Sequence, residues 1–340
     1  MKKIKKIFKK INFSNSSFTI FLFICLLALI ILSIFSGKIN LLKLIFISDY
    51  QKSFKILEII FWEIRLPRTI LAVVAGFSLG ICGAAMQGLF RNPLADPSII
   101  GVTASASLGS VIIFYFGFAN LFFFALPLGG IIGATVSVII IYFIIQKNVS
   151  ILVIILTGVA INSFASALIS LTLNLSPSPY AAYEIMFWLL GSLADKNLNH
   201  ILIIIPLAIF GWFLILFSKK WLSVLSLGEE TAQSMGLDLK IFRSKIIIGS
   251  ALSIGSVVSI TGGISFIGLV VPHLLRPLYK YDPGKLLLPS GIGGAIMLLL
   301  ADIIIRLIGI NPELQIGVVT AIIGAPFFVY LIFYIRRVEV

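Results

Sequence analysis

Residues 218–245, SKKWLSVLSLGEETAQSMGLDLKIFRSK, form a long charged segment in a chain that is otherwise mostly apolar. On both sides of it, apolar blocks of membrane-spanning length follow one another, and about 20 apolar residues cross a bilayer as an α-helix. Most connections between these blocks are short. The sequence therefore predicts an all-α integral membrane protein with one transmembrane domain over residues 1–340 and a long charged loop between two spans.

The composition excludes a water-soluble domain. Hydrophobic residues make up 59% of the 340 residues and charged residues 11%, and the mean hydropathy is +1.14. The net charge of +13 could suit nucleic acid. The basic residues, however, lie in loops and at the termini, which predicts contact with membrane lipid and no nucleic-acid partner. Cys25 and Cys82 lie inside apolar runs, so neither a disulfide framework nor a CxxC metal site is expected, and no cofactor is predicted.

The N-terminus combines a basic tail, residues 1–17, with an apolar run from Phe18 to Phe35. This order resembles a signal peptide, but the run is long for one and no small-x-small cleavage site follows it. We therefore expect an uncleaved first helix. Nine more helices follow in the prediction, and the ten expected spans are 18–36, 67–90, 98–117, 122–145, 151–173, 200–217, 246–260, 263–279, 286–308 and 315–335.

The distribution of Lys and Arg predicts that both termini are cytoplasmic. With ten spans in that orientation, 18 of the 26 basic residues lie inside and eight outside, as the positive-inside rule requires. The outer segment 37–66 disagrees with the rule because it holds five of the eight. A second long outer segment, 174–199, has an apolar middle that is too short to span, so we expect an interfacial helix there. The eight outer basic residues are Lys38, Lys43, Lys52, Lys55, Arg65, Arg68, Lys196 and Arg306.

Small residues recur at four-residue spacing in the span 67–90, where Gly76, Gly80 and Gly88 fall in one series and Gly83 lies beside it. Small-xxx-small faces allow helices to approach closely in lipid. The pattern is therefore typical of helix packing, and a face that lines a translocation pathway is the alternative.

The motif RNPLADP, residues 91–97, predicts a tight cytoplasmic turn. Asn92-Pro93 and Asp96-Pro97 are turn-initiating pairs, and a residue before proline is disfavoured in a helix. The helix should stop at Arg91, and the next should restart with Pro97 in its first turn, where a missing N–H is tolerated.

The charged loop itself is expected to contain two short helices. Gly228 precedes Glu229 and Glu230, and an acidic pair favours a helix N-terminus. Gly236 is a plausible C′ residue for that helix. A second short helix should run from Leu237 toward Arg243. From the residues alone, a solvated cytoplasmic loop is the favoured reading of the segment, and a coupling element is the alternative.

Five further residues invite a functional reading. Arg65 and Arg68 flank Pro67 at one end of the second span, where interfacial snorkelling is common. Arg306 can pair with Asp302 one helical turn earlier. His200 and His273 have no neighbouring Cys or carboxylate pattern, so we expect structural or interfacial histidines and no metal site.

Three motifs carry a resemblance to a known family: RLPRTILAVVAGFSLGICGAAMQGLFRNPLADPSIIG at 65–101, LGEETAQSMGLDL at 227–239 and GGISFIGLVVPHLLRPL at 262–278. LLLADIIIRL at 298–307 and IGVVTAIIGAPFFVYL at 316–331 extend it. In this order and spacing they resemble the permeases that import ferric siderophores, haem and vitamin B12, the membrane subunits of type II ABC importers. The resemblance covers residues 60–336.

The resemblance implies a bacterial cytoplasmic-membrane protein with ten helices and several partners. These are a second permease (a copy or a paralogue), two ABC ATPase subunits and a periplasmic or lipid-anchored substrate-binding protein. Glu229, Glu230 and Gly236 would then belong to the coupling element on the ATPase, and the 91–97 turn would lie beside it. Arg65, Arg68 and Arg306 would dock acidic residues of the binding protein. The substrate would be an iron chelate, with vitamin B12 as the alternative.

Three other functional classes fit the sequence less well. The chain has no GxxxxGK[ST] phosphate loop, so it does not hydrolyse ATP itself. Ion-coupled secondary transporters usually carry intramembrane acids or histidines as relays, and only Asp302 is a clear candidate. A membrane-embedded enzyme would need a cluster of His, Asp or Glu, which the sequence does not offer.

Overall fold

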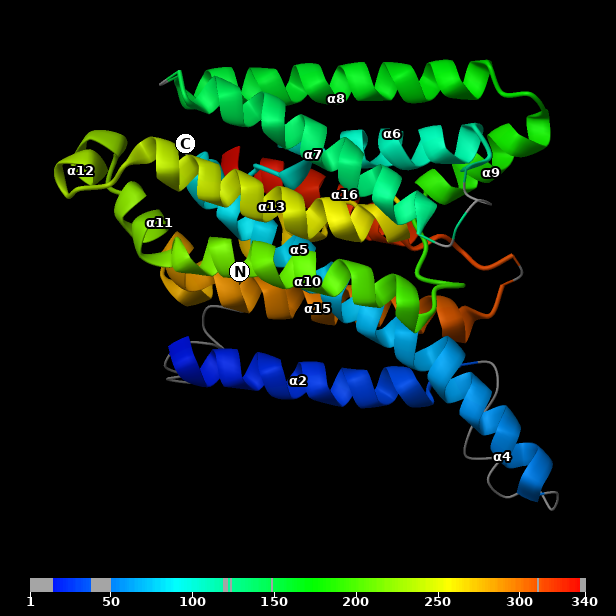
Figure 1. The fold of residues 1–340 in the computed structure, drawn as a ribbon. Helices are drawn as coiled ribbons and strands as arrows, with labels where there is room; N and C mark the ends of the chain where they lie inside the picture. The colour runs from blue at the N-terminus through cyan, green and yellow to red at the C-terminus, as the bar shows by residue number, and fades with distance from the viewer. Residues whose placement is uncertain are drawn as a thin grey trace.

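The computed structural model describes residues 15–37, 50–118, 122, 124–147, 149–310 and 312–336, and within them every regular element is a helix (Figure 1). The predicted all-α fold is therefore confirmed. In chain order the elements are α2 (Asn15–Phe35), α4 (Tyr50–Ile59), the π-helix η1 (Ile60–Arg65), α5 (Leu66–Leu89), the 3₁₀ helix η2 (Pro97–Ile100), α6 (Val102–Tyr115), α7 (Ala125–Ile145), α8 (Ile151–Asn174), α9 (Pro179–Leu189), α10 (Leu198–Phe217), α11 (Lys219–Leu225), α12 (Glu229–Ser234), α13 (Leu239–Thr261), α14 (Ile267–Leu275), the 3₁₀ helix η4 (Arg276–Tyr279), α15 (Pro283–Ile308) and α16 (Ile316–Arg336).

Seven of the described helices are long and apolar enough to cross a membrane. They lie at Ser16–Phe35, Lys55–Leu89, Ala125–Ile145, Ile151–Asn174, Leu198–Phe217, Leu239–Thr261 and Pro283–Ile308. The helices at 102–115 and 316–330 are apolar but shorter. The chain is thus a multi-pass membrane protein, and the finer prediction of ten spans goes beyond these seven.

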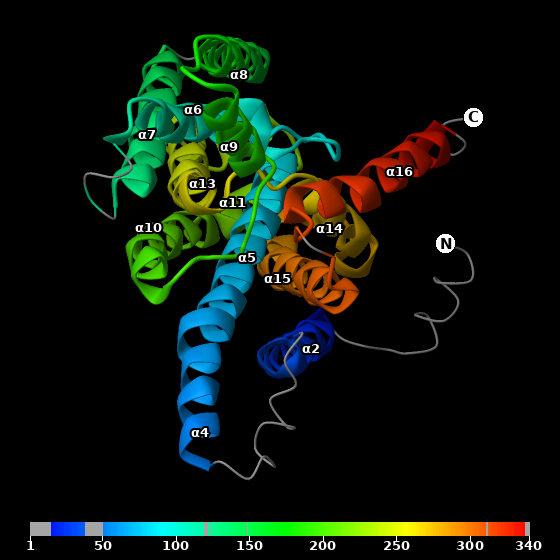
Figure 2. The ribbon, with the colours of Figure 1, turned by 90° about the vertical axis from the view of Figure 1, so that its right-hand side faces the viewer.

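Helix α5 is the central element, with α10 and α13 on one side of it and α14 and α15 on the other (Figure 2). Nearly all of its residues are buried. Apolar burial alone does not hold helices together in lipid, so close backbone contact through small residues has to supply the packing. By contrast, α2 and α8 are mostly exposed, and each would face lipid or another chain.

The helix of α5 begins earlier than the sequence predicted. Residues 50–65 form α4 and η1 and continue directly into α5, so that part of the segment 37–66 is a helical extension that projects from the bundle (Figure 1). The π-turns lie just before Pro67. Pro67 has no N–H and cannot donate to the carbonyl one turn back. The N–H of the preceding residue, Leu66, donates to Phe61 O, five residues earlier, which is the hydrogen bond of a π-helix.

Two other boundaries differ from the prediction. Helix α13 begins at Leu239 and not at 246, so the short helix expected over 237–243 is its first two turns. Its N-cap is Asp238, whose carboxylate accepts from the N–H groups of Lys240 and Ile241. The span expected over 263–279 is only α14 followed by η4, because residues 262–266 are not helical. A helix is present within 174–199, as expected, and it is α9; its position at the membrane interface stays a prediction.

Candidate functional site

The segment 218–245 lies at the end of the bundle opposite α9 and α4 (Figure 1). Helix α12 begins after Gly228, whose φ is +117° and therefore suits glycine. It ends in a Schellman motif, in which Gly236 N–H donates to Gln233 O at 2.9 Å and Leu237 N–H donates to Ala232 O at 3.0 Å. Gly236 has φ +91°. The predicted N-terminus and C′ glycine of this helix are both confirmed.

An ion pair connects α12 to α13. Arg243 donates to Glu229 at 2.7 Å and, through its other terminal nitrogen, to the backbone oxygen of Val149 at 2.8 Å. Glu229 is in the first turn of α12, and Val149 lies just before α8. Arg243 is buried, so one side chain fixes α12 relative to two long helices. Glu230, the neighbouring acid, is exposed.

Several apolar side chains next to α12 are exposed on the surface of the chain. Leu227, Met235 and Ile241 are each more than half exposed, although the segment is otherwise polar. A small cavity of 300 Å³ opens beside them between α10, α11 and the start of α13. Exposed apolar groups with polar neighbours are typical of a protein interaction surface.

The 91–97 turn has the predicted form. Arg91 adopts φ +49°, Asn92 Oδ1 accepts from Leu94 N–H at 2.9 Å, and Asp96 Oδ1 accepts from Ser98 N–H at 2.9 Å. Asp96 is the N-cap of η2, and Pro97 is its first residue. Pro93 is half-buried within the turn. The turn follows the end of α5 that packs on α11, so it adjoins the charged segment.

A polar contact near this end was not predicted from the sequence. Pro272 interrupts α14 and supplies no N–H for the carbonyl of Gly268. The side-chain amide of Gln87 lies 3.4 Å from that oxygen and 3.2 Å from Leu269 O, and Arg276 donates to Gln87 Oε1 at 2.6 Å. Gln87 therefore connects α5 to the broken helix α14. An isolated glutamine in an apolar span was the available signal.

At the opposite end, three arginines and two acids form what we call the arginine cluster: Arg65, Arg68, Asp302, Arg306 and Glu313. Asp302 is fully buried and lies 2.7 Å from Arg68 Nε and 2.8 Å from a terminal nitrogen of Arg306. The pairing of Asp302 with Arg306 across one helical turn is confirmed. Arg68 also forms an ion pair with Glu313, whose side chain is 35% exposed.

The arginines also hold α2 against the bundle. Arg306 donates to the backbone oxygen of Ser33 at 2.8 Å and to its hydroxyl at 2.6 Å. Arg65 donates to Ile34 O at 2.9 Å. Arg65, Arg68 and Arg306 are 5%, 9% and 9% exposed. The three residues expected to face a partner are thus buried and bonded within the chain.

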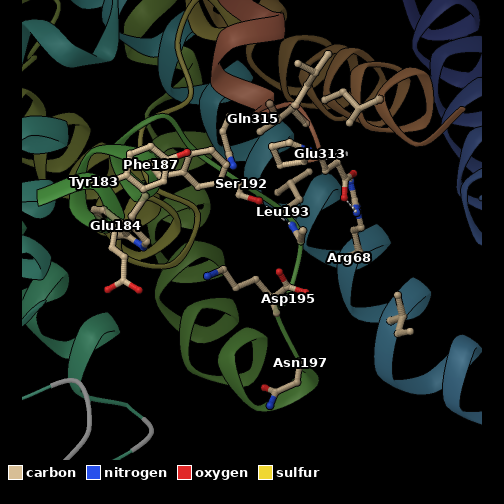
Figure 3. A pocket seen from close by; sticks show the side chains of 18 of the residues that line it. Arg68, Tyr183, Glu184, Phe187, Ser192, Leu193, Asp195, Asn197, Glu313 and Gln315 are labelled. Atoms are coloured by element: carbon tan, nitrogen blue, oxygen red, sulfur yellow. Dashed lines mark hydrogen bonds and ion pairs between the residues drawn. The ribbon is translucent and has the colours of Figure 1, made fainter. Parts of the chain in front are cut away.

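A cavity of 750 Å³, here called the mouth cavity, opens beside the arginine cluster (Figure 3). Aromatic side chains of α9 form one wall, and Tyr183 stacks on Phe187. Arg68 and Glu313 form the opposite wall, where Figure 3 shows them joined. Lys196 lies in the connecting loop, where burial lowers its pKa and nearby Asp195 acts in the opposite direction.

The mouth cavity is bounded by a tight backbone crossing. Ser192 N–H donates to Thr261 O at 2.7 Å, and Ile316 N–H donates to Gly191 O at 3.0 Å. A Cβ on Gly191 would lie 2.3 Å from Gly263 O, and the φ of Gly191 is +81°. Only glycine fits there, so the ends of α9 and α13 and the start of α16 are fixed relative to one another.

The four glycines of the span 67–90 lie at helix–helix contacts, which agrees with the packing interpretation of their spacing. A Cβ on Gly76, Gly80 or Gly83 would come within 2.4 Å of a backbone oxygen of α15 or α14. Gly88 lies against Leu222 of α11. None of them reaches the surface of the chain.

His200 takes part in a helix cap. His200 completes a capping box at the start of α10, where its N–H donates to Asn197 Oδ1 at 3.2 Å and its Nδ1 accepts from Asn197 N–H at 3.4 Å. His273 lies in the last turn of α14. Among the described residues, no three His, Cys, Asp or Glu side chains gather where they could hold a metal ion.

Comparisons with known proteins agree with this architecture. The model of the FecCD transport family matches residues 20–334. The ABC transporter permease protein YvrB of Bacillus subtilis, which is uncharacterized, is 36% identical over 278 residues, covering 80% of this chain and 78% of YvrB. The vitamin B12 import system permease protein BtuC of Salmonella typhi is also 36% identical over 278 residues, covering 81% of this chain and 84% of BtuC.

A solved structure is similar over almost the whole chain. It is described as an inward-facing conformation of a transporter assigned to the metal-chelate ABC type, and the two chains are 30% identical. The TM-score is 0.82, and the match covers 94% of this chain and 99% of the other.

Proposed function

Because the chain belongs to the FecCD transport family of ABC transporter permeases, we propose that it is the membrane subunit of an importer for a bulky metal chelate. We favour an iron chelate, either a ferric siderophore or haem, and retain vitamin B12 as the alternative because BtuC is named for it. The work would take place in the bacterial cytoplasmic membrane. Separate ATPase subunits would supply the energy, since the chain has no phosphate loop of its own.

The observation that carries this proposal is the segment 218–245. It places a capped short helix, a buried ion pair and exposed apolar residues at one end of a bundle whose other end carries the mouth cavity. We assign Gly228, Glu229, Glu230 and Gly236 to coupling. A partner that moves α12 would pull Arg243, and with it α13 and the start of α8.

The proposed topology has ten spans with both termini on the cytoplasmic side, and the α12 end is then cytoplasmic. The working unit would contain two permease chains. Helix α8 supports this because Ser163, Ser166, Ser170 and Asn174 are exposed on it at helical spacing. Such a polar stripe is unsuited to lipid. It suits a pathway between two copies better than the buried face of α5 does.

The mouth cavity is the proposed contact region for a substrate-binding protein. Arg68 reaches it, whereas Arg65 and Arg306 lie deeper and are bonded to α2. A docking acid would therefore have to compete with Glu313 for Arg68. Of the three arginines only Arg68 lines the mouth cavity, so we assign contact with the binding protein to Arg68.

A secondary transporter is disfavoured by the surroundings of Asp302. A proton or sodium relay needs an acid that can change its charge or its ligands during transport. Asp302 instead lies between Arg68 and Arg306 and is fully buried.

Uptake of labelled ferric siderophore, haem and cobalamin in a strain that lacks the chain would test the substrate. We expect one metal chelate to depend on the chain and on ATP. Purification with the ATPase should yield two permease chains and two nucleotide-binding subunits. Substrate transport by the chain alone, without ATP, would contradict the proposal.

Gly236→Val tests the coupling assignment. The left-handed backbone at Gly236 is strained for a β-branched residue, although a Cβ there meets no atom within 4 Å. Uptake should fall while membrane insertion persists. Gly117→Val is a matched control, because Gly117 also has positive φ and open space but lies outside the segment. Full uptake by Gly236→Val would leave 218–245 as a solvated loop.

A further inference from the structure

An apolar groove runs along the membrane-facing side of α7, α10 and α13 and belongs to neither site described above. Its volume is 450 Å³. Two of its polar members, Thr135 and Ser256, donate their hydroxyls within their own helices, to Ile131 O and Ser253 O. Ile139 and Phe143 are about half exposed or more. The lining residues are Ile131, Ala134, Thr135, Val138, Ile139, Tyr142, Phe143, Leu207, Ile248, Ala251, Leu252 and Ser256.

Both of the long walls end in an exposed lysine at the α12 end of the bundle. On α7 the groove residues Ile139 and Phe143 lead at four-residue spacing to Lys147, just past the C-cap. On α13 the groove residues Leu252 and Ile248 lead to Lys245 at spacings of four and then three residues, which also keeps them on one helix face. Lys147 and Lys245 are both exposed.

The two lysines belong to neighbouring parts of the fold. Arg243 donates to Val149 O at 2.8 Å, so the connection after α7 packs on the first turns of α13. Lys147 and Lys245 are each two residues from this contact. The acid nearest to it, Glu229, is already paired with Arg243. The Tyr142 ring lines the same end of the groove, and tyrosine is favoured at the level of lipid headgroups.

We propose that this groove binds an anionic phospholipid, with an acyl chain between α7, α10 and α13 and the phosphate between Lys147 and Lys245. The groove lies within helices of membrane-spanning length, so hydrocarbon is the medium that fills it. The paired lysines add a preference for negative charge, as basic groups at a membrane surface do. The lipid belongs to the leaflet at the α12 end, where it contacts α13, the helix whose Arg243 forms the ion pair with Glu229 of α12.

Native mass spectrometry of the full chain, exchanged into mixed micelles with phosphatidylglycerol or phosphatidylcholine of identical acyl chains, tests the site. We expect the chain to retain phosphatidylglycerol about 25-fold better, from two lysines of about five-fold each. Lys147→Gln with Lys245→Gln should abolish this preference. Ile139→Trp, which fills the groove from an exposed position, should lower retention of both lipids. Lys280→Gln, an exposed lysine elsewhere, is the control.

Four results would overturn the proposal. Equal retention of both lipids by the unaltered chain would show that Lys147 and Lys245 do not discriminate between an anionic and a zwitterionic headgroup. An unchanged preference in the double variant, or the same loss in Lys280→Gln, would make the attraction a general property of the basic surface. A change of oligomeric state in Ile139→Trp, with lipid retention unaltered, would make the groove a protein interface.

Discussion

Replacing Asp302 with asparagine should destabilise the protein more than any other single change in the arginine cluster. The cluster contains three arginines and two acids, so its formal charge rises from +1 to +2 when this carboxylate is lost. Each of its two ion pairs, at a charge separation of about 4 Å and an effective dielectric constant of about 20, contributes about 4 kcal/mol before desolvation. Desolvation of the carboxylate offsets part of this. Removal of one partner from a buried pair costs about 3–5 kcal/mol, and we expect a loss of unfolding free energy in this range.

The assay is reversible unfolding in mixed detergent micelles, followed by the fluorescence of the four tryptophans. Glu313→Gln should cost about 1 kcal/mol or less, because Glu313 is one-third exposed and such pairs are screened by water. Asp195→Asn, an exposed acid at the same end, is the control and should be neutral within about 0.5 kcal/mol.

A double variant separates charge from packing. Asp302→Asn combined with Arg306→Gln should be less destabilised than the sum of the two single changes, because the second change removes a cation that the first leaves unpaired. A loss below about 1 kcal/mol in Asp302→Asn, or strict additivity in the double variant, would refute the reasoning.

Three other predictions concern packing, coupling and pH. Gly80→Ala should lower the unfolding free energy by about 1–3 kcal/mol, since its Cβ would lie 2.0 Å from Ser290 O; thermal unfolding of the variant measures this. Glu229→Gln should reduce ATP-dependent uptake while the ATPase still copurifies, because the ion pair to Arg243 fixes α12, and unchanged uptake would argue against it. Asp282→Ala should cost about 1 kcal/mol by removing the N-cap of α15. Burial acts to raise the pKa of Asp282, but hydrogen bonds from Ser223 and Lys285 outweigh it and lower the pKa. The contribution of the Asp282 carboxylate to stability is therefore complete above the unfolded pKa of about 3.9 and is lost as the pH falls through the lower folded pKa. The unfolding free energies of the unaltered chain and of Asp282→Ala, measured across acidic pH, should converge.

The sequence predicted those parts of the fold that depend on local properties. The apolar block 151–173 corresponds to α8, and 286–308 differs from α15 by three residues at one end, because a bilayer sets the length of an apolar helix directly. The Schellman motif at Gly236 was also predictable, since the left-handed C′ position favours glycine whatever the helix packs against.

Boundaries that depend on neutralised charge could not be predicted in the same way. The sequence predicted a short helix over 237–243 and a separate span from 246. It did not predict that the two form one helix, α13, which runs through Lys240, Arg243 and Lys245. The helix continues through them because Asp238 caps it and Glu229 neutralises Arg243. Helix α4 was missed because the charges of 50–65 were assigned to an outer loop, although the helix simply extends beyond the apolar part of α5.

The bonding of the arginines depends on residues far apart in the chain. Arg68 is separated by 234 positions from Asp302, and Arg306 by 273 from Ser33, so no local pattern reports these contacts. These contacts account for part of the basic residues in the predicted outer segments, which the positive-inside rule does not explain. Of the eight basic residues in the predicted outer segments, Arg68 and Arg306 form ion pairs with acids of the chain and Arg65 donates to Ile34 O. These three are therefore not the solvated charges that the positive-inside rule concerns.

This bonding also limits how the cluster could serve a partner. Displacing Asp302 would strand a buried carboxylate, and displacing Ser33 would free the end of α2 from Arg306. Glu313 differs because it is partly exposed and borders the mouth cavity. Its carboxylate can return to water when another acid takes its place on Arg68, so the exchange costs little desolvation. An arriving acid therefore gains only the difference in free energy between its own ion pair with Arg68 and the similar pair that Glu313 gives up. Docking through Arg68 would then contribute more to orientation and association rate than to affinity.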